Sequence, residues 1–274
     1  MVVNDKGVAV VETCLRTLER GVDNLQGVRG VLSIVSSVLQ RGVLPESSVF
    51  RRGAIEVFAV NIPAEKVGGD IYDFLEPVEG KVGIFVGDVS GKGVSAATYM
   101  AKIIGDFRHK ARLEKTPNVA LGKLNAGLLK GPRGMFVTAV YIIVDVSTGV
   151  LAVSNGGHPP FLLIRDNKVT VIDVPGGPPL GIITTEYPMT SMTLQRGDRL
   201  LLITDGVFDT KDRAQHRLGF DALVAFLSQA GASRIGQDED KHNLIDSVIC
   251  YVNKFSEGTK RRVDDITLVE LIYN

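Results

Sequence analysis

The strongest constraint on the fold is a series of short apolar runs in residues 136–204, each separated from the next by a turn sequence. Typical turns are Ser147-Thr148-Gly149, Asp166-Asn167 and Arg196-Gly197-Asp198. The runs are Phe136–Val146, Val150–Ser154, Phe161–Ile164, Val169–Val174, Met189–Leu194 and Arg199–Thr204. Closely spaced β-rich runs joined by turns predict an antiparallel sheet.

Helical segments are grouped between further strand-like runs in the rest of the chain. Strands are expected at Ile55–Ile62, Lys81–Val86 and Ile266–Ile272, with a loop over Val67–Phe74 that enters another strand. Helices are expected at Val94–Leu113, Asn118–Lys130, Phe220–Gln229 and Lys241–Phe255. Strands in runs with helices grouped between them predict an α+β layered architecture. Residues 1–45 have helical periodicity interrupted by glycines, which predicts an N-terminal helical arm that ends at Pro45.

The composition narrows the functional class. The chain has 31 Lys+Arg and 31 Asp+Glu among 274 residues. It therefore lacks the excess of positive charge that is typical of proteins that bind duplex nucleic acid. A hydrophobic share of 45% excludes a disordered acidic chain. No signal peptide and no apolar run of membrane-spanning length is visible. Cys14 and Cys250 form no CxxC pair, as expected of ordinary thiols in a reducing, cytoplasmic compartment.

The candidate chemistry lies in aspartates that end apolar runs or adjoin glycines. These are Asp70, Asp88, Asp205 and the pair Asp264-Asp265. A single Asp before Gly is usually a turn residue. Four such places that converge would repel one another unless cations neutralise them, and hard carboxylate oxygens suit Mg²⁺ or Mn²⁺. On spacing alone, a metal site and ordinary turns both remain open.

An ordered series of motifs resembles the SpoIIE/RsbU-type serine phosphatases, a bacterial branch of the metal-dependent (PPM, type 2C) protein phosphatases. The motifs are Pro63-Ala-Glu-Lys-Val-Gly-Gly-Asp-Ile-Tyr-Asp-Phe74, Gly87-Asp-Val-Ser-Gly-Lys-Gly-Val-Ser-Ala-Ala97, Met135-Phe-Val-Thr138, Ser154-Asn-Gly-Gly-His-Pro-Pro160, Pro179-Leu-Gly181, Gly197-Asp-Arg-Leu-Leu-Leu-Ile-Thr-Asp-Gly206 and Asp264-Asp-Ile-Thr-Leu268. The resemblance covers about residues 39–272. Each motif alone is weak, but the ordered set is specific.

The resemblance implies a four-layer α-β-β-α sandwich over residues 46–274, made of two antiparallel sheets flanked by helices. It also implies two divalent cations, Mn²⁺ or Mg²⁺. Asp88 would bridge the two ions and hold the attacking water, and no protein nucleophile would be needed. The other expected ligands are Asp70, the Val89 carbonyl, Asp205 and Asp264, with Asp265 as a possible ligand or supporting neighbour. The possible substrate contacts are Lys92 and the run Lys260, Arg261 and Arg262.

The reaction implied by the resemblance is hydrolysis of phosphoserine or phosphothreonine on a protein. The expected substrate is a STAS-type anti-sigma-factor antagonist in a partner-switching, stress-response pathway. Residues 1–45 would mediate self-association or docking of an activator. The chain departs from the family pattern after Asp205-Gly206, where Val207–Thr210 replaces a Thr-Glu-Ala-like sequence, and this change would alter the lip of the site.

Other interpretations are weaker. Gly91–Ala96 fits a G-x-G-x-x-A dinucleotide fingerprint, but the acidic residue expected about 20 positions later is missing. A Walker P-loop fails because Val86 stands where its first glycine should be. A non-catalytic binding module is disfavoured because every acidic position of the pattern is retained. His158, in Gly-Gly-His-Pro-Pro, can brace its turn or transfer a proton, and the structural role is favoured.

Overall fold

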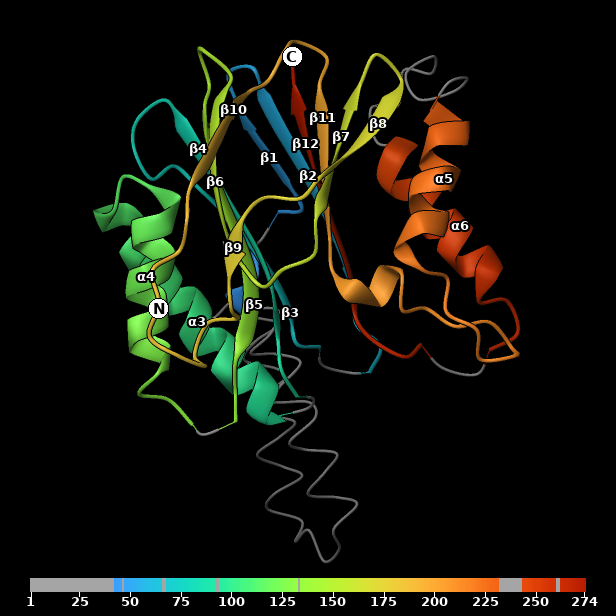
Figure 1. Ribbon diagram of the computed structural model, residues 1–274, viewed down its shortest axis with the longest axis horizontal. Helices are drawn as coiled ribbons and strands as arrows, with labels where there is room; N and C mark the ends of the chain where they lie inside the picture. The colour runs from blue at the N-terminus through green and yellow to red at the C-terminus, as the bar shows by residue number, and fades with distance from the viewer. Residues whose placement is uncertain are drawn as a thin grey trace, which may run out of the picture.

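The computed structural model describes residues 42–45, 47–65, 68–91, 94–132, 134–231, 243–259 and 262–274. In these ranges two β-sheets lie face to face, and a pair of helices covers the outer face of each (Figure 1). Helices α3 (Val94–Leu113) and α4 (Pro117–Leu128) cover one sheet. Helices α5 (Phe220–Gly231) and α6 (Asn243–Phe255) cover the other. The described chain is therefore a four-layer α-β-β-α sandwich.

The sheet beneath α5 and α6 is antiparallel throughout its described part, with the strand order β1-β2-β12-β11-β7-β8. The strands are β1 (Val49–Arg52), β2 (Ile55–Ile62), β7 (Phe161–Arg165), β8 (Lys168–Ile172), β11 (Arg199–Ile203) and β12 (Ile266–Tyr273). Strand β12 is buried along its whole length, because it lies between β2 and β11 and has a hydrophobic layer on each face. A short 3-10 helix, η1 (Asp205–Val207), follows β11.

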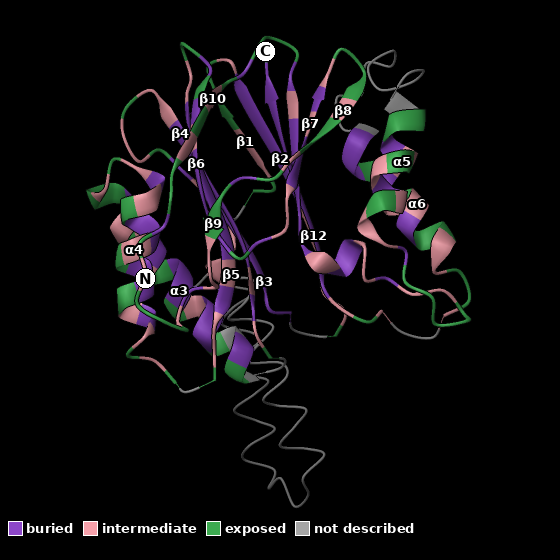
Figure 2. Ribbon diagram, in the orientation of Figure 1, coloured by how far each residue is buried: buried purple, intermediate pink, exposed green. Residues whose placement is uncertain are grey.

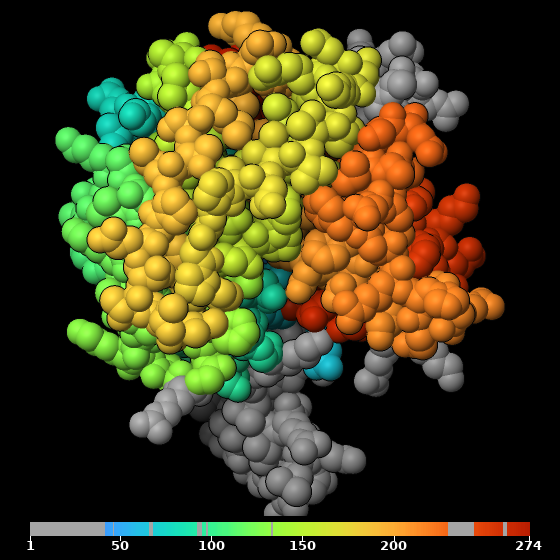
Figure 3. All heavy atoms as spheres, in the orientation of Figure 1, coloured from blue at the N-terminus to red at the C-terminus, as the bar shows by residue number. Residues whose placement is uncertain are grey.

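The sheet beneath α3 and α4 has the order β10-β6-β5-β4-β3, and β9 pairs in parallel with β6. The strands are β3 (Asp70–Leu75), β4 (Lys81–Val89), β5 (Val137–Asp145), β6 (Val150–Gly156), β9 (Gly176–Gly177) and β10 (Thr190–Thr193). In the space-filling view the α5 segment lies against the segment that holds β7 and β8 (Figure 3).

The period-2 alternation of the strands divides the core into three layers. In β4, Val86 faces the space between the sheets, whereas its neighbour Phe85 faces outward and stacks on Phe107 of α3 with ring centroids 4.1 Å apart. The same division holds on β12, where Val269 packs between the sheets and Leu268 packs beneath α5 and α6. Figure 2 shows buried residues along both sheets and on the inner faces of the helices.

The fold class expected from the sequence is confirmed, and the bounds of β2 and α3 agree with those predicted. Two short strands were not predicted. β1 ends in two exposed arginines and β9 has two glycines, so neither carries an apolar pattern; among the described strands β1 pairs with β2 alone. The predicted helical arm lies almost wholly outside the described residues, which begin at Gly42. No helix in the part of the chain that the structure describes is long and apolar enough to cross a membrane.

Candidate metal and phosphate site

The aspartates expected from the sequence meet at one edge of the sandwich. Strand β3 begins at Asp70, β4 ends just after Asp88, β11 ends before Asp205, and β12 begins after Asp265. Asp70 and Asp88 are direct cross-strand partners in the β3–β4 register. Both continue the row of residues that faces the space between the sheets, because Tyr72 on β3 and the even-numbered residues of β4 pack there.

Asp70 is the most buried member of the set, with 1% of its surface exposed. Its Oδ2 accepts hydrogen bonds from the hydroxyls of Thr204 and Thr267, both at 2.7 Å and both from the opposite sheet. Burial raises the pKa of Asp70 well above its usual value, the nearby Asp88 raises it further, and the two threonine hydrogen bonds oppose this rise. The free energy of an ionised Asp70 thus depends on these hydroxyls and on any cation that binds beside it.

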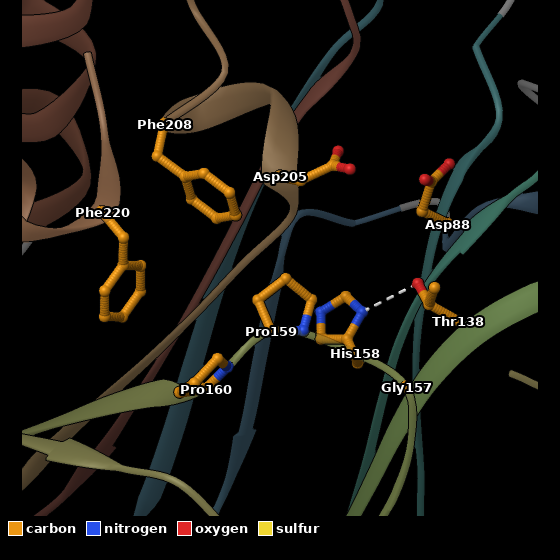
Figure 4. Close-up of a pocket in the computed structure, with 9 residues that line it drawn as sticks. All are labelled: Asp88, Thr138, Gly157, His158, Pro159, Pro160, Asp205, Phe208 and Phe220. Atoms are coloured by element: carbon orange, nitrogen blue, oxygen red, sulfur yellow. Dashed lines mark hydrogen bonds between the residues drawn. The ribbon is translucent and has the colours of Figure 1, made fainter. Parts of the chain in front are cut away.

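A second pair of carboxylates lies across the site from the first. Asp205, at the start of η1, has its pKa raised by burial and then by Asp264 and Asp209. Asp205 and Asp88 come from opposite sheets and line the same cavity, which has a volume of about 320 Å³. Figure 4 shows the Asp205 carboxylate directed across this cavity toward the side on which Asp88 lies. Asp88 and Asp205 therefore face one cavity, and each has a second carboxylate close to it, Asp70 beside Asp88 and Asp264 beside Asp205.

Asp265 has a different environment from its neighbour Asp264. Its Oδ1 accepts the Ala64 amide at 2.7 Å and its Oδ2 accepts the Gly69 amide at 2.5 Å. The carboxylate therefore holds the loop that enters β3. The backbone packs tightly here: a side chain at Gly206 would overlap the Asp265 carbonyl oxygen, and a Cβ at Gly69 would lie 2.6 Å from the Val89 carbonyl oxygen.

His158 braces the corner between β6 and β7. Its amide donates to Asn155 Oδ1 at 2.8 Å, and Asn155 Nδ2 donates back to its carbonyl at 2.9 Å. Its Nδ1 lies 3.2 Å from the hydroxyl oxygen of Thr138, also in the cavity wall. Burial lowers the pKa of His158 to about 3, and the Ile203 carbonyl opposes this shift only in part. The ring is therefore neutral near pH 7.

Among the expected substrate contacts only Arg262 belongs to the described residues; Lys92, Lys260 and Arg261 lie outside them. The Arg262 Nη2 donates to Asn253 Oδ1 at 2.9 Å, near the end of α6. Sequence reasoning did not assign roles to Thr138, Thr204 and Thr267, although each stands inside a motif. Their positions in the sequence do indicate a role beside the aspartates, since Thr204 directly precedes Asp205 and Thr267 closely follows Asp265.

The donor set suits a hard divalent cation that keeps part of its water shell. In the described ranges, no three His, Cys, Asp or Glu side chains form a group that by itself would hold a metal ion. Mg²⁺ commonly takes only one or two protein carboxylates and completes its octahedron with water and phosphate oxygens. Burial and a neighbouring carboxylate raise the pKa values of Asp70 and Asp205, and carboxylate pairs of this kind fit such an open site.

The family model for stage II sporulation protein E (SpoIIE) matches residues 78–273. This chain belongs to the SpoIIE family. The match extends from just before β4 to the end of β12, so it includes Asp88, Asp205 and Asp264. The family resemblance expected from the sequence is thereby confirmed.

This SpoIIE-family chain is similar in sequence to one characterised protein and in fold to two solved structures. The phosphoserine phosphatase RsbU of Bacillus subtilis is 27% identical over 195 residues, which are 70% of this chain and 57% of RsbU. The chain therefore spans less than two thirds of the length of that relative. The SiaA-PP2C domain of Pseudomonas aeruginosa is 19% identical with a TM-score of 0.75, over 91% of this chain and 97% of that domain. RsbX, solved in complex with magnesium, is 15% identical with a TM-score of 0.59, over 81% of this chain and 97% of RsbX.

Proposed function

We propose that the chain is a metal-dependent protein phosphatase that hydrolyses phosphoserine or phosphothreonine on a protein substrate. The observation that carries this proposal is the meeting of Asp88 and Asp205 from opposite sheets at one cavity, each beside a second carboxylate. Membership of the SpoIIE family and the similarity to RsbU, a phosphoserine phosphatase, support it.

Two divalent cations, Mg²⁺ or Mn²⁺, are the proposed cofactors, and the magnesium complex of RsbX supports this choice. Asp88 would contact both ions, and Asp70, Asp205, Asp264 and the Val89 carbonyl would complete the protein's share of the ligands. When bound, the cations would lower the pKa of water and neutralise charge on the phosphoryl oxygens. We assign Asp265 to holding the β3 entry loop, because both of its oxygens accept backbone amides.

The chain's own residues would hold the carboxylates in position and shape the cavity around the phosphoryl group. Thr204 and Thr267 would fix the Asp70 carboxylate, and the half-buried Asp88 and Asp205 would present theirs to the cavity. No cysteine is needed as a nucleophile. His158 would shape the cavity rather than donate a proton, since an imidazole with a pKa of about 3 carries no proton to give near pH 7.

The proposal also covers the identity of the substrate, the residues that would contact it and the role of residues 1–45. We infer that the substrate is a phosphorylated STAS-type antagonist of an anti-sigma factor, in a partner-switching pathway of the kind implied by the resemblance to RsbU-type phosphatases. Lys92, Lys260, Arg261 and Arg262 would attract the acidic surface of the phosphoprotein. Residues 1–45 would bind an activator or a second copy of the chain.

The proposal is tested by comparing wild type, Asp88→Asn and Asp205→Asn with Mn²⁺ and p-nitrophenyl phosphate or a phosphoserine protein. Each substitution should lower kcat/KM by at least about 100-fold, because it removes a carboxylate that would hold the cations, and the cations would stabilise the charge of the transition state. Titration calorimetry with Mn²⁺ gives a second readout, in which both variants should bind the ion more weakly. Asp173→Asn, at an exposed position directly after β8, is the control and should behave as wild type.

Equal activity in all four proteins, or no turnover of either substrate with Mn²⁺ present, would contradict the proposal. The second result, combined with intact binding of a phosphoprotein, would favour a non-catalytic binding module.

A further inference from the structure

One wall of the carboxylate-lined cavity is apolar. Phe208, Phe220, Pro159 and Pro160 line it together with Asp88 and Asp205. In Figure 4 the two aromatic rings and the prolines lie on the Asp205 side of the cavity, away from Asp88. We call these four residues the aromatic lip. The polar residues of the proposed reaction centre thus adjoin an apolar surface. Burying this surface against a ligand, away from water, would be favourable.

The two aromatic residues are brought together by a closed loop. The Phe208 amide donates to the Asp205 carbonyl at 3.0 Å, and the Gly219 amide donates to the Phe208 carbonyl at 2.8 Å. Phe220 follows directly, so the rings meet edge to face with centroids 5.7 Å apart and planes at 85°. This geometry is favourable for an aromatic pair and holds both rings in place before any ligand arrives.

The proline side of the lip is equally constrained. Gly157 has a positive φ of 73°, and a side chain on it would run into Pro179. The paired hydrogen bonds between Asn155 and His158 close the same corner. Pro159 and Pro160 follow with fixed φ angles, so this half of the lip is also formed in advance.

We propose that the aromatic lip is a specificity subsite that takes one apolar side chain adjacent to the phosphoserine or phosphothreonine of the substrate protein. This inference rests on the proposed phosphatase function and deepens it. The cavity volume of about 320 Å³ is near the lower end of ligand sites, roughly 300–1,000 Å³, so it suits a phosphoryl group with one neighbouring side chain.

The subsite is tested with two pairs of short phosphoserine peptides and Mn²⁺-loaded enzyme. Within each pair, leucine or asparagine stands directly before or directly after the phosphoserine. Wild type should show a kcat/KM at least about 10-fold higher for the leucine peptide in one of the pairs, which is the discrimination a preformed apolar pocket gives. Phe208→Asn should bring that ratio close to one, whereas Phe208→Leu should largely keep it.

A matched control is Phe226→Leu, because Phe226 of α5 stacks on Tyr251 of α6 and does not line the cavity. This variant should keep both the ratio and the activity of wild type. Equal kcat/KM for leucine and asparagine peptides in wild type would overturn the subsite and leave the phosphatase function standing. A uniform loss in Phe208→Asn with an unchanged ratio would also overturn it. No turnover of any peptide would overturn the phosphatase function and the subsite together.

Discussion

Thr267 on β12 donates its hydroxyl to Oδ2 of Asp70 on β3 at 2.7 Å, and the two residues belong to opposite sheets. The same hydroxyl oxygen accepts Asn61 Nδ2 at 2.8 Å, and the Thr267 amide donates to the Thr204 hydroxyl oxygen at 2.9 Å. Thr204 then donates to the same Asp70 oxygen. These bonds join the two halves of the sandwich at the proposed metal site.

Removing this hydroxyl should weaken metal binding. Thr267→Val keeps the shape of the side chain but takes a donor from a buried carboxylate, so Mn²⁺ affinity should fall by about 10-fold, as for other residues that orient ligands. The free energy of unfolding should fall by about 1–3 kcal/mol. Titration calorimetry and denaturant unfolding measure the two effects. Thr267→Ser restores the hydroxyl and should restore affinity; Mn²⁺ binding by the valine variant as tight as in wild type would contradict the role.

The adjacent aspartates should separate into a ligand and a loop anchor. Asp265→Asn replaces a carboxylate that accepts two backbone amides, so it should lower the free energy of unfolding by about 1–3 kcal/mol. Asp264→Asn changes a carboxylate that accepts the Asp265 amide at 3.0 Å, and it should lower stability less than Asp265→Asn. It should abolish most Mn²⁺-dependent activity, because Asp264 lies beside Asp205. Urea unfolding and phosphatase assays on both variants test the assignment. Greater loss of Mn²⁺-dependent activity in Asp265→Asn than in Asp264→Asn would reverse it.

Titration of His158 should not contribute to the pH dependence of the reaction near neutrality. Its pKa of about 3 keeps the ring neutral from pH 5 to pH 9, so no limb of the profile in this range arises from it. His158→Asn should lower kcat several-fold through disturbed packing around Thr138 while the shape of the kcat/KM profile persists. A limb with a midpoint between pH 6 and pH 7 that vanishes in the variant would show that the imidazole titrates during turnover.

Glu270 lies outside the proposed active site, and its ionisation should make the free energy of unfolding depend on pH. Its side chain is fully buried beneath α6, 3.3 Å from Arg199 Nε. Burial raises its pKa from 4.5 to about 7; Arg199 opposes the rise and Asp246 adds to it. Because the folded-state pKa is raised, the stabilisation is complete below about pH 4.5 and is lost as the pH rises toward and past 7, on the order of 3 kcal/mol in all.

Unfolding in guanidinium at several pH values from 5 to 8 measures this effect. Glu270→Gln cannot ionise and should flatten the fall in the free energy of unfolding over that range. Glu76→Gln is the control, since hydrogen bonds from Gly80 and Arg52 lower the pKa of that exposed carboxylate and it should not affect the slope above pH 5. A slope in Glu270→Gln equal to that of wild type would rule out Glu270 as its source.

Local patterns in the sequence were enough to predict most elements. The apolar run Ile55–Ile62 and the helical stretch Val94–Leu113 agree with the observed bounds, because each has a clear period of its own. Strand β4 continues past the predicted Val86 to Val89, since its pairing with β5 extends to Val137. Asp88 is therefore held within a strand rather than in the loop after it. Pairing with a distant strand leaves no trace in the local pattern.

By itself, the sequence determined the order of the strands along the chain, the family and the acidic residues that carry the proposed chemistry. These follow from periodicity and motif order, which are properties of neighbouring residues. Only the tertiary structure decided that Asp264 and Asp265 have different surroundings, that Thr204 and Thr267 bond to Asp70, and that Phe208 and Phe220 face the same cavity as Asp88. Those relationships join residues from both sheets, and they exist only once the hydrophobic layer between the sheets has brought the strand ends together.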